Sequence, residues 1–237
     1  MSSYNIFANG VATRPSVIAE LGYFGNDSAW LTDNDTFAWD STSCTPTLNN
    51  IGGRPCISLT SDGNATTDYG QFQSTVAGIL LGTSTQTYTQ KGSFRMTTAT
   101  QDIAFGLSAI DTSIIASNST DLIRLQKLSA ATAFSITYRK ASGTAAVTGT
   151  FGPTIAADTW YDYELVVSKA NSTTGSGRIK VYMGTDVAAG GSLSLVFDQV
   201  IATEFPDTVK MASLGAWRAG SAANVSAYMS YFGVRMV

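Results

Sequence analysis

The chain has 237 residues, a net charge of −3 and 13% charged residues, which is about half of the roughly 25% usual in soluble domains. It contains no histidine, which excludes Ser-His-Asp and Cys-His catalysis and zinc sites with histidine ligands. It also lacks a clustered stripe of Lys and Arg and a phosphate-binding glycine loop, which argues against nucleic-acid binding and nucleotide chemistry.

The first twenty residues have a mixed composition, and Arg14-Pro15 favours an extended backbone there. We expect residues 1–20 to form an N-terminal arm that packs on the domain or on a neighbouring subunit. Residues 21–237 are expected to form one domain, because no low-complexity linker divides them. No apolar run is long enough for a secretory signal or a membrane span, so the chain is expected to be made in the cytoplasm and not to cross a membrane.

Residues 23–72 are dense in Asp, Asn, Gly and aromatic residues, with short apolar pieces at 29–31, 37–39 and 57–59. This composition predicts short strands joined by long loops. Large aromatic residues of a β-sandwich usually fill its core. Trp30 and Trp39 are the expected exceptions, because they lie within these polar loops.

Two cysteines, Cys44 and Cys56, bracket a stretch that is rich in turn-forming residues. A disulfide between them would stabilise the fold by about 3 kcal/mol through loop entropy. Free buried thiols, typical of a reducing compartment, fit the same spacing. The sequence leaves both alternatives open.

Strand signals become regular after residue 76, with turn clusters at the spacing that a two-sheet sandwich needs. The best candidate for a short helix is 111–119. The predicted strands are 87–98, 103–110, 121–128, 134–139, 145–151, 161–169, 179–183, 193–197, 211–217 and 228–237.

Three of these segments carry a family resemblance through their order. Asp158-Thr159-Trp160-Tyr161 opens one strand, Lys180-Val181-Tyr182-Met183-Gly184 forms the next, and the aromatic run 228–237 ends the chain. Residues 90–237 thereby resemble the concanavalin-A-like, laminin-G-type jelly roll, in versions found in structural proteins of tailed bacteriophages. The resemblance implies an all-β fold of two antiparallel sheets packed face to face, with an N-terminal extension.

Lectins of this broad superfamily bind calcium and sugar through Asp and Asn side chains in loops. Asp33-Asn34-Asp35 could supply such oxygens, although it lies outside the matched region, and solvated turn residues are the alternative. We expect no metal and no cofactor. Trp30, Trp39, Asp33 and Asp35 are the candidate ligand-binding residues.

Glycoside hydrolysis is the enzyme class that a jelly roll without histidine could still perform, because it needs two suitably spaced carboxylates. The chain has three glutamates, Glu20, Glu164 and Glu204. Asp162 and Glu164 lie on one face of a predicted strand, about 6.5–7 Å apart. Alternation predicts that this face meets solvent while Tyr161 and Tyr163 enter the core, so we expect no enzyme.

The main functional hypothesis is therefore a virion structural protein, a capsid decoration or cement subunit that contacts the major capsid protein and other copies of itself, as a homotrimer by analogy. The alternative is a carbohydrate- or receptor-binding module of a phage fibre or spike that grips a host-surface glycan. A glycan-cleaving enzyme is a third hypothesis, tested by replacing Glu164.

Overall fold

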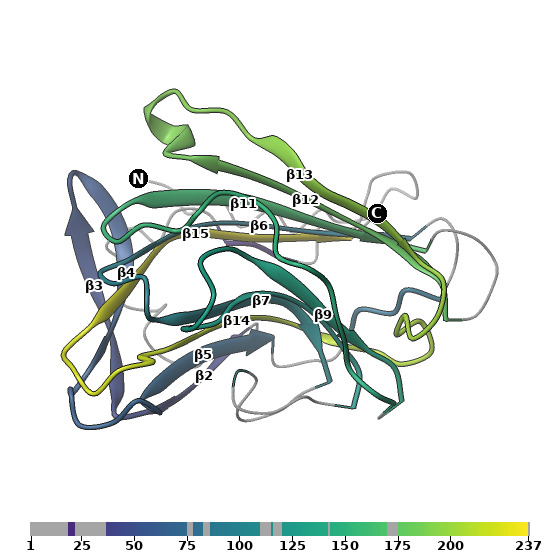
Figure 1. The fold of residues 1–237 in the computed structure, drawn as a ribbon, viewed down its shortest axis with the longest axis horizontal. Helices are drawn as coiled ribbons and strands as arrows, with labels where there is room; N and C mark the ends of the chain where they lie inside the picture. The colour runs from purple at the N-terminus through teal and green to yellow at the C-terminus, as the bar shows by residue number, and fades with distance from the viewer. Residues whose placement is uncertain are drawn as a thin grey trace.

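The computed structural model describes residues 19–21, 37–74, 78–82, 86–109, 115, 120–141, 143–169 and 175–236. These residues form two antiparallel sheets that lie one over the other (Figure 1). In long strands such as β11 (Trp160–Ser168) and β12 (Gly177–Thr185), buried apolar side chains alternate with partly exposed residues and face the other sheet, which is the pattern of a two-layer sandwich. The all-β sandwich expected from the sequence is confirmed.

The first sheet has eight strands. Strand β4 pairs with residues 226–229 of β15, and β1 pairs with residues 232–234. The two strands therefore follow one another along the same edge of β15. The strands, in sheet order, are β13 (Ser194–Ile201), β12 (Gly177–Thr185), β11 (Trp160–Ser168), β6 (Thr87–Met96), β15 (Ser226–Met236), β4 (Arg54–Ser61) and β3 (Cys44–Ile51), with β1 (Ala19–Leu21) added on β15.

The second sheet has seven strands and forms the other layer. Its central strands β7 and β14 pair along seven residues, and β14 continues to β5 and β2. The strands, in sheet order, are β10 (Ala146–Val147), β9 (Ser135–Arg139), β8 (Leu122–Lys127), β7 (Asp102–Ser108), β14 (Ala212–Arg218), β5 (Tyr69–Ser74) and β2 (Phe37–Thr42). A 3₁₀ turn, η2 (Val187–Ala189), follows β12.

Aromatic rings and one polar network join the two sheets across the core. The Tyr163 ring of β11 stacks on Phe105 of β7, with centroids 4.2 Å apart. Gln90 of β6 is fully buried and donates from Nε2 to the carbonyl oxygen of Leu214 at 3.0 Å. Its Oε1 accepts a hydrogen bond from the Tyr163 hydroxyl at 3.2 Å. Buried polar groups are costly unless paired, so this network favours one register between the sheets.

The ten strands predicted after residue 76 are all present, although β10 covers two residues where the sequence predicts seven. The segment before them differs more from expectation. Residues 37–74 contain four strands of six to eight residues, where short strands and long loops are predicted. The β-sandwich therefore extends well beyond the region that carries the family resemblance.

The cysteine alternatives are resolved in favour of free thiols. Cys44 pairs with Ser61, whereas Cys56 pairs with Asn49, five residues further along β3. Five residues of strand span about 16 Å, which is far beyond disulfide distance. The stretch between the cysteines is not one loop, because most of it belongs to the hairpin of β3 and β4.

The expected arm, residues 1–20, falls outside the described residues except for Ala19 and Glu20, whose backbone belongs to β1. The candidate helix at 111–119 also falls outside them, apart from Ile115. None of the helical segments that the structure describes is long and apolar enough to cross a bilayer.

Candidate functional site

The outer face of the seven-stranded sheet, which points away from the core, carries an ordered set of polar side chains. On β5, Phe72 enters the core, so Tyr69 and Gln71 point outward on alternate positions. Cross-strand pairing then sets which outward residues are neighbours. One row across the sheet is Asp102, Arg218, Tyr69 and Thr42, and the next row is Gln126, Ala104, Ala216, Gln71 and Asp40.

Much of this face is covered instead of solvated. Gln71 and Gln126 are buried, and so are the small residues Ala104 and Ala216 between them. Ile115 packs on Leu214 and Ala216 of β14 and provides part of the cover. A sheet face with small residues at its centre and long polar side chains beside them has room above the backbone for a ligand.

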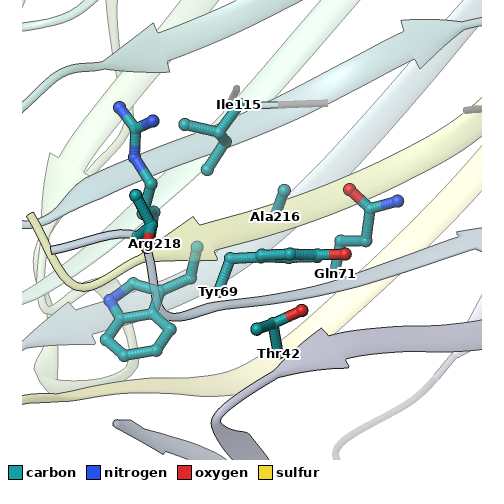
Figure 2. Close-up of a pocket in the computed structure, with 8 residues that line it drawn as sticks. Thr42, Tyr69, Gln71, Ile115, Ala216 and Arg218 are labelled. Carbon is teal, nitrogen blue, oxygen red and sulfur yellow. The ribbon is translucent and has the colours of Figure 1, made fainter. Parts of the chain in front are cut away.

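A pocket of about 200 Å³ occupies this room. Figure 2 shows the Tyr69 ring and the Gln71 amide close to Ala216 and Thr42, with Arg218 and Ile115 on the other side of Ala216. The complete lining is Thr42, Thr67, Tyr69, Gln71, Ile115, Ala216, Trp217 and Arg218. An aromatic ring, an amide, hydroxyl groups and a guanidinium are the groups that contact hydroxylated ring compounds in protein pockets.

The Tyr69 side chain is held by a hydrogen bond from its hydroxyl to Asp40 Oδ2, at 2.8 Å. Burial, together with this bond, raises the pKa of Tyr69 above its usual value, so the phenol stays neutral and remains a donor. Asp40 lies one row away from Tyr69 on the neighbouring strand β2 and does not line the pocket. Tyr69 is thus a fixed ring at the pocket wall.

Arg218 is the charged residue of the pocket lining that the structure describes. Its Nε donates to Asp102 Oδ2 at 2.5 Å, and Asp102 is completely buried. A second guanidinium, Arg124, lies on the same face and donates from Nε to Gln126 Oε1 at 2.6 Å. Burial, followed by the charge of Arg218, lowers the pKa of Arg124 to about 10, although the charge of Asp102 opposes the change. The charges of Arg124, Arg218 and Asp102 therefore interact with one another.

Of the four residues predicted to bind a ligand, Trp30, Asp33 and Asp35 lie outside the described residues. Trp39 lies in β2, where a loop position is expected, and that placement is corrected. Its ring contacts the core residue Phe72, with centroids 5.3 Å apart, and is partly buried. The structure therefore does not bring Trp39 into the pocket, which is on the opposite face of β5.

The carboxylates Asp162 and Glu164 lie as predicted on the face of β11 that points away from the core. Both already have partners. Asp162 Oδ2 accepts the Val187 backbone N–H at 2.8 Å, and Glu164 pairs with Lys91 at 3.2 Å. They belong to the eight-stranded sheet and do not line the pocket.

The residues that do line the pocket, above all Gln71 and Arg218, are not among those predicted from the sequence. A signal was present in 69–73, where Gly70 and Phe72 separate Tyr69, Gln71 and Gln73, whereas in 214–218 only Arg218 is polar. What the alternation does not reveal is that these two segments pair with each other. Within the described part of the chain, no three His, Cys, Asp or Glu residues gather as a metal site would require.

Comparison with known proteins identifies similar folds among solved structures. No protein-family model and no curated protein matches the chain. Among solved structures, the PL-14 alginate lyase from Aplysia kurodai aligns with a TM-score of 0.62 at 10% identity, over 94% of this chain and 99% of that one. The endo-1,3-β-glucanase from Streptomyces sioyaensis aligns with a TM-score of 0.58 at 10% identity, over 97% and 99% of the two chains.

Lectin II from Ulex europaeus also aligns, with a TM-score of 0.54 at 10% identity, over 86% of this chain and 94% of that one. At these identities the likeness concerns the fold. None of these similarities supports the predicted capsid role or a phage origin, and enzymes stand beside lectins among the similar structures. The chain has the concanavalin-A-like jelly-roll fold of legume lectins.

Proposed function

We propose that this protein is a carbohydrate-binding β-sandwich that holds its ligand on the outer face of the seven-stranded sheet. The observation that carries the proposal is the pocket between Tyr69, Gln71 and Arg218, with small Ala216 as its floor. Sugar rings bind to sites that combine an aromatic ring with directed polar groups. The lectin fold of similar structures supports the same function.

We further propose that the protein binds its ligand without cleaving it. The carboxylate pair considered from the sequence, Asp162 and Glu164, lies on the other sheet and is engaged in other contacts. The described pocket lining contains no carboxylate that could act as acid or nucleophile. The capsid partner, the homotrimer and the virion location remain predictions from the sequence.

Binding is tested with a glycan array, followed by titration calorimetry on the saccharides that bind. Replacing Tyr69 with Ala should weaken binding by about tenfold or more, because the pocket loses its ring and a wall. The matched control is Tyr182→Ala, which removes a tyrosine from the outward face of β12 in the other sheet. Equal affinities of the two variants, or no binding to any glycan, would contradict the proposal.

Cleavage is tested separately, by incubating the wild-type protein with the polysaccharides that bind and measuring new reducing ends. We expect no release above the background of a heat-denatured sample. Reproducible release would replace the binding function with an enzymatic one, and Glu164→Gln would then show whether the strand β11 carboxylates take part.

A further inference from the structure

We propose that the saccharide bound in this pocket carries a carboxylate, as uronic and sialic acids do, and that Arg218 is the residue that recognises it. This inference rests on the proposed function and adds the chemical class of the ligand. The starting observation is that Arg218 supplies the charge of the described pocket lining, since the other seven lining residues are neutral.

A carboxylate holds the guanidinium of Arg218 on its Nε side. The bond to buried Asp102 uses Nε, and Asp102 also accepts the backbone N–H of Ser129, so this carboxylate is fixed on two sides. Within the described residues, the two Nη groups of Arg218 have no hydrogen-bond partner. They form the planar pair of donors that matches the two oxygens of a carboxylate.

The local charge also favours an anion. Arg218 is the cation of the described lining, and its partner Asp102 is completely buried and does not belong to that lining. Asp40, on the neighbouring row of the same face, accepts the Tyr69 hydroxyl and lies outside the pocket lining. A ligand carboxylate would therefore meet a guanidinium and no carboxylate among the described lining residues, whereas a neutral sugar would not use this charge.

The test compares ligands that differ only in charge. Trigalacturonate and sialyllactose represent the two sources of a sugar carboxylate, and each is titrated against its own methyl ester. We expect at least one acid to bind about tenfold to hundredfold more tightly than its ester, as for a charge-assisted contact. The preference should fall as salt rises. Because this comparison uses the wild-type protein, it does not depend on any variant folding.

Variants then assign the preference to one side chain. Arg218→Gln should remove the difference between acid and ester, and Arg218→Lys should retain part of it because it retains the charge. The control Lys180→Gln removes a positive charge from the outward face of the other sheet and should change nothing.

The outcomes separate the two proposals. If the protein binds neutral glycans on the array and binds each methyl ester as tightly as the acid, the carboxylate inference fails while the carbohydrate-binding function stands. An acid preference that survives in Arg218→Gln, with the variant folded, would also overturn the role of Arg218. If no saccharide of either kind binds, both proposals fail.

Discussion

Arg218 and Asp102 are directly opposite each other on neighbouring strands β14 and β7, and the guanidinium Nε donates to the carboxylate at 2.5 Å. Asp102 has no exposed surface, whereas about a quarter of the Arg218 side chain is exposed. The pair thus links a buried carboxylate on β7 to a side chain that lines the pocket. Its carboxylate fixes the side chain that we propose for ligand recognition.

Replacing Asp102 with Asn should therefore destabilise the protein and disorder the pocket. We expect a loss of about 2 kcal/mol in the free energy of unfolding, because Arg218 and Arg124 lose their compensating charge. Urea unfolding measures it. The control Asp158→Asn breaks the pair with Arg95 on a carboxylate that is more than half exposed, and should change stability little. Equal losses of unfolding free energy in the two variants would show that buried Asp102 contributes no more to stability than exposed Asp158.

Gln90 is predicted to hold the two sheets in register. Gln90→Ala removes the partner of the Tyr163 hydroxyl and leaves a cavity, so unfolding should become easier by about 2–4 kcal/mol. Gln199→Ala is the matched control, because that residue is exposed on edge strand β13. Calorimetric melting of both variants tests this, and an unchanged melting temperature in Gln90→Ala would refute it.

Asp207 should make stability depend on pH in the acid range. Burial alone raises the pKa of Asp207, but hydrogen bonds from Lys140 and Lys169 outweigh burial and the pKa lies below its ordinary value of 3.8. A lowered folded pKa means that the stabilisation is complete above 3.8 and is lost as the pH falls through the lower folded value.

Urea unfolding of wild type and Asp207→Asn between pH 7 and pH 2 measures this contribution. The variant should be less stable by about 3 kcal/mol at neutral pH, where a buried ion cluster is broken, and the difference should shrink at the acid end. Asp198→Asn, whose pair with Arg178 is exposed to solvent, should show little difference at any pH. A difference that is independent of pH would assign the effect to packing alone.

Both thiols should be unreactive in the folded protein. Burial raises the pKa of Cys44 to about 12 and that of Cys56 to about 11, so neither forms the reactive thiolate at neutral pH. Ellman's reagent should label no thiol in the native state at pH 8 and two in denaturant without reductant. A count below two in denaturant would reveal a disulfide and contradict the pairing register of β3 and β4.

Trp39 offers a direct test of the sequence-based ligand site. Because its ring packs on Phe72, Trp39→Ala should lower stability by about 2–3 kcal/mol while leaving the affinity for glycans nearly unchanged. Trp30→Ala tests the remaining part of that prediction, by the same two measurements. Loss of affinity in folded Trp39→Ala would restore Trp39 as a ligand-binding residue.

Most strands after residue 76 were predictable because a span of strand length either alternates, as in β11, or is almost wholly apolar, as in β7. In β11, Tyr161, Tyr163, Leu165 and Val167 are buried on one face, as the sequence predicts. The strand in segment 44–56 was not predictable, because Pro46 and the adjacent Asn49 and Asn50 are residue types that are common in turns. Here they occupy β3, at the edge of its sheet, where a missing N–H is tolerated.

By itself, the sequence determined the all-β sandwich and the absence of histidine chemistry, since strand periodicity and residue types are local properties. Only the tertiary structure decided the candidate site. Tyr69 and Gln71 come from β5 and Arg218 from β14, segments about 150 positions apart in the chain. Cross-strand hydrogen bonds between distant segments set their register, and a shift of one residue would turn each of these side chains into the core.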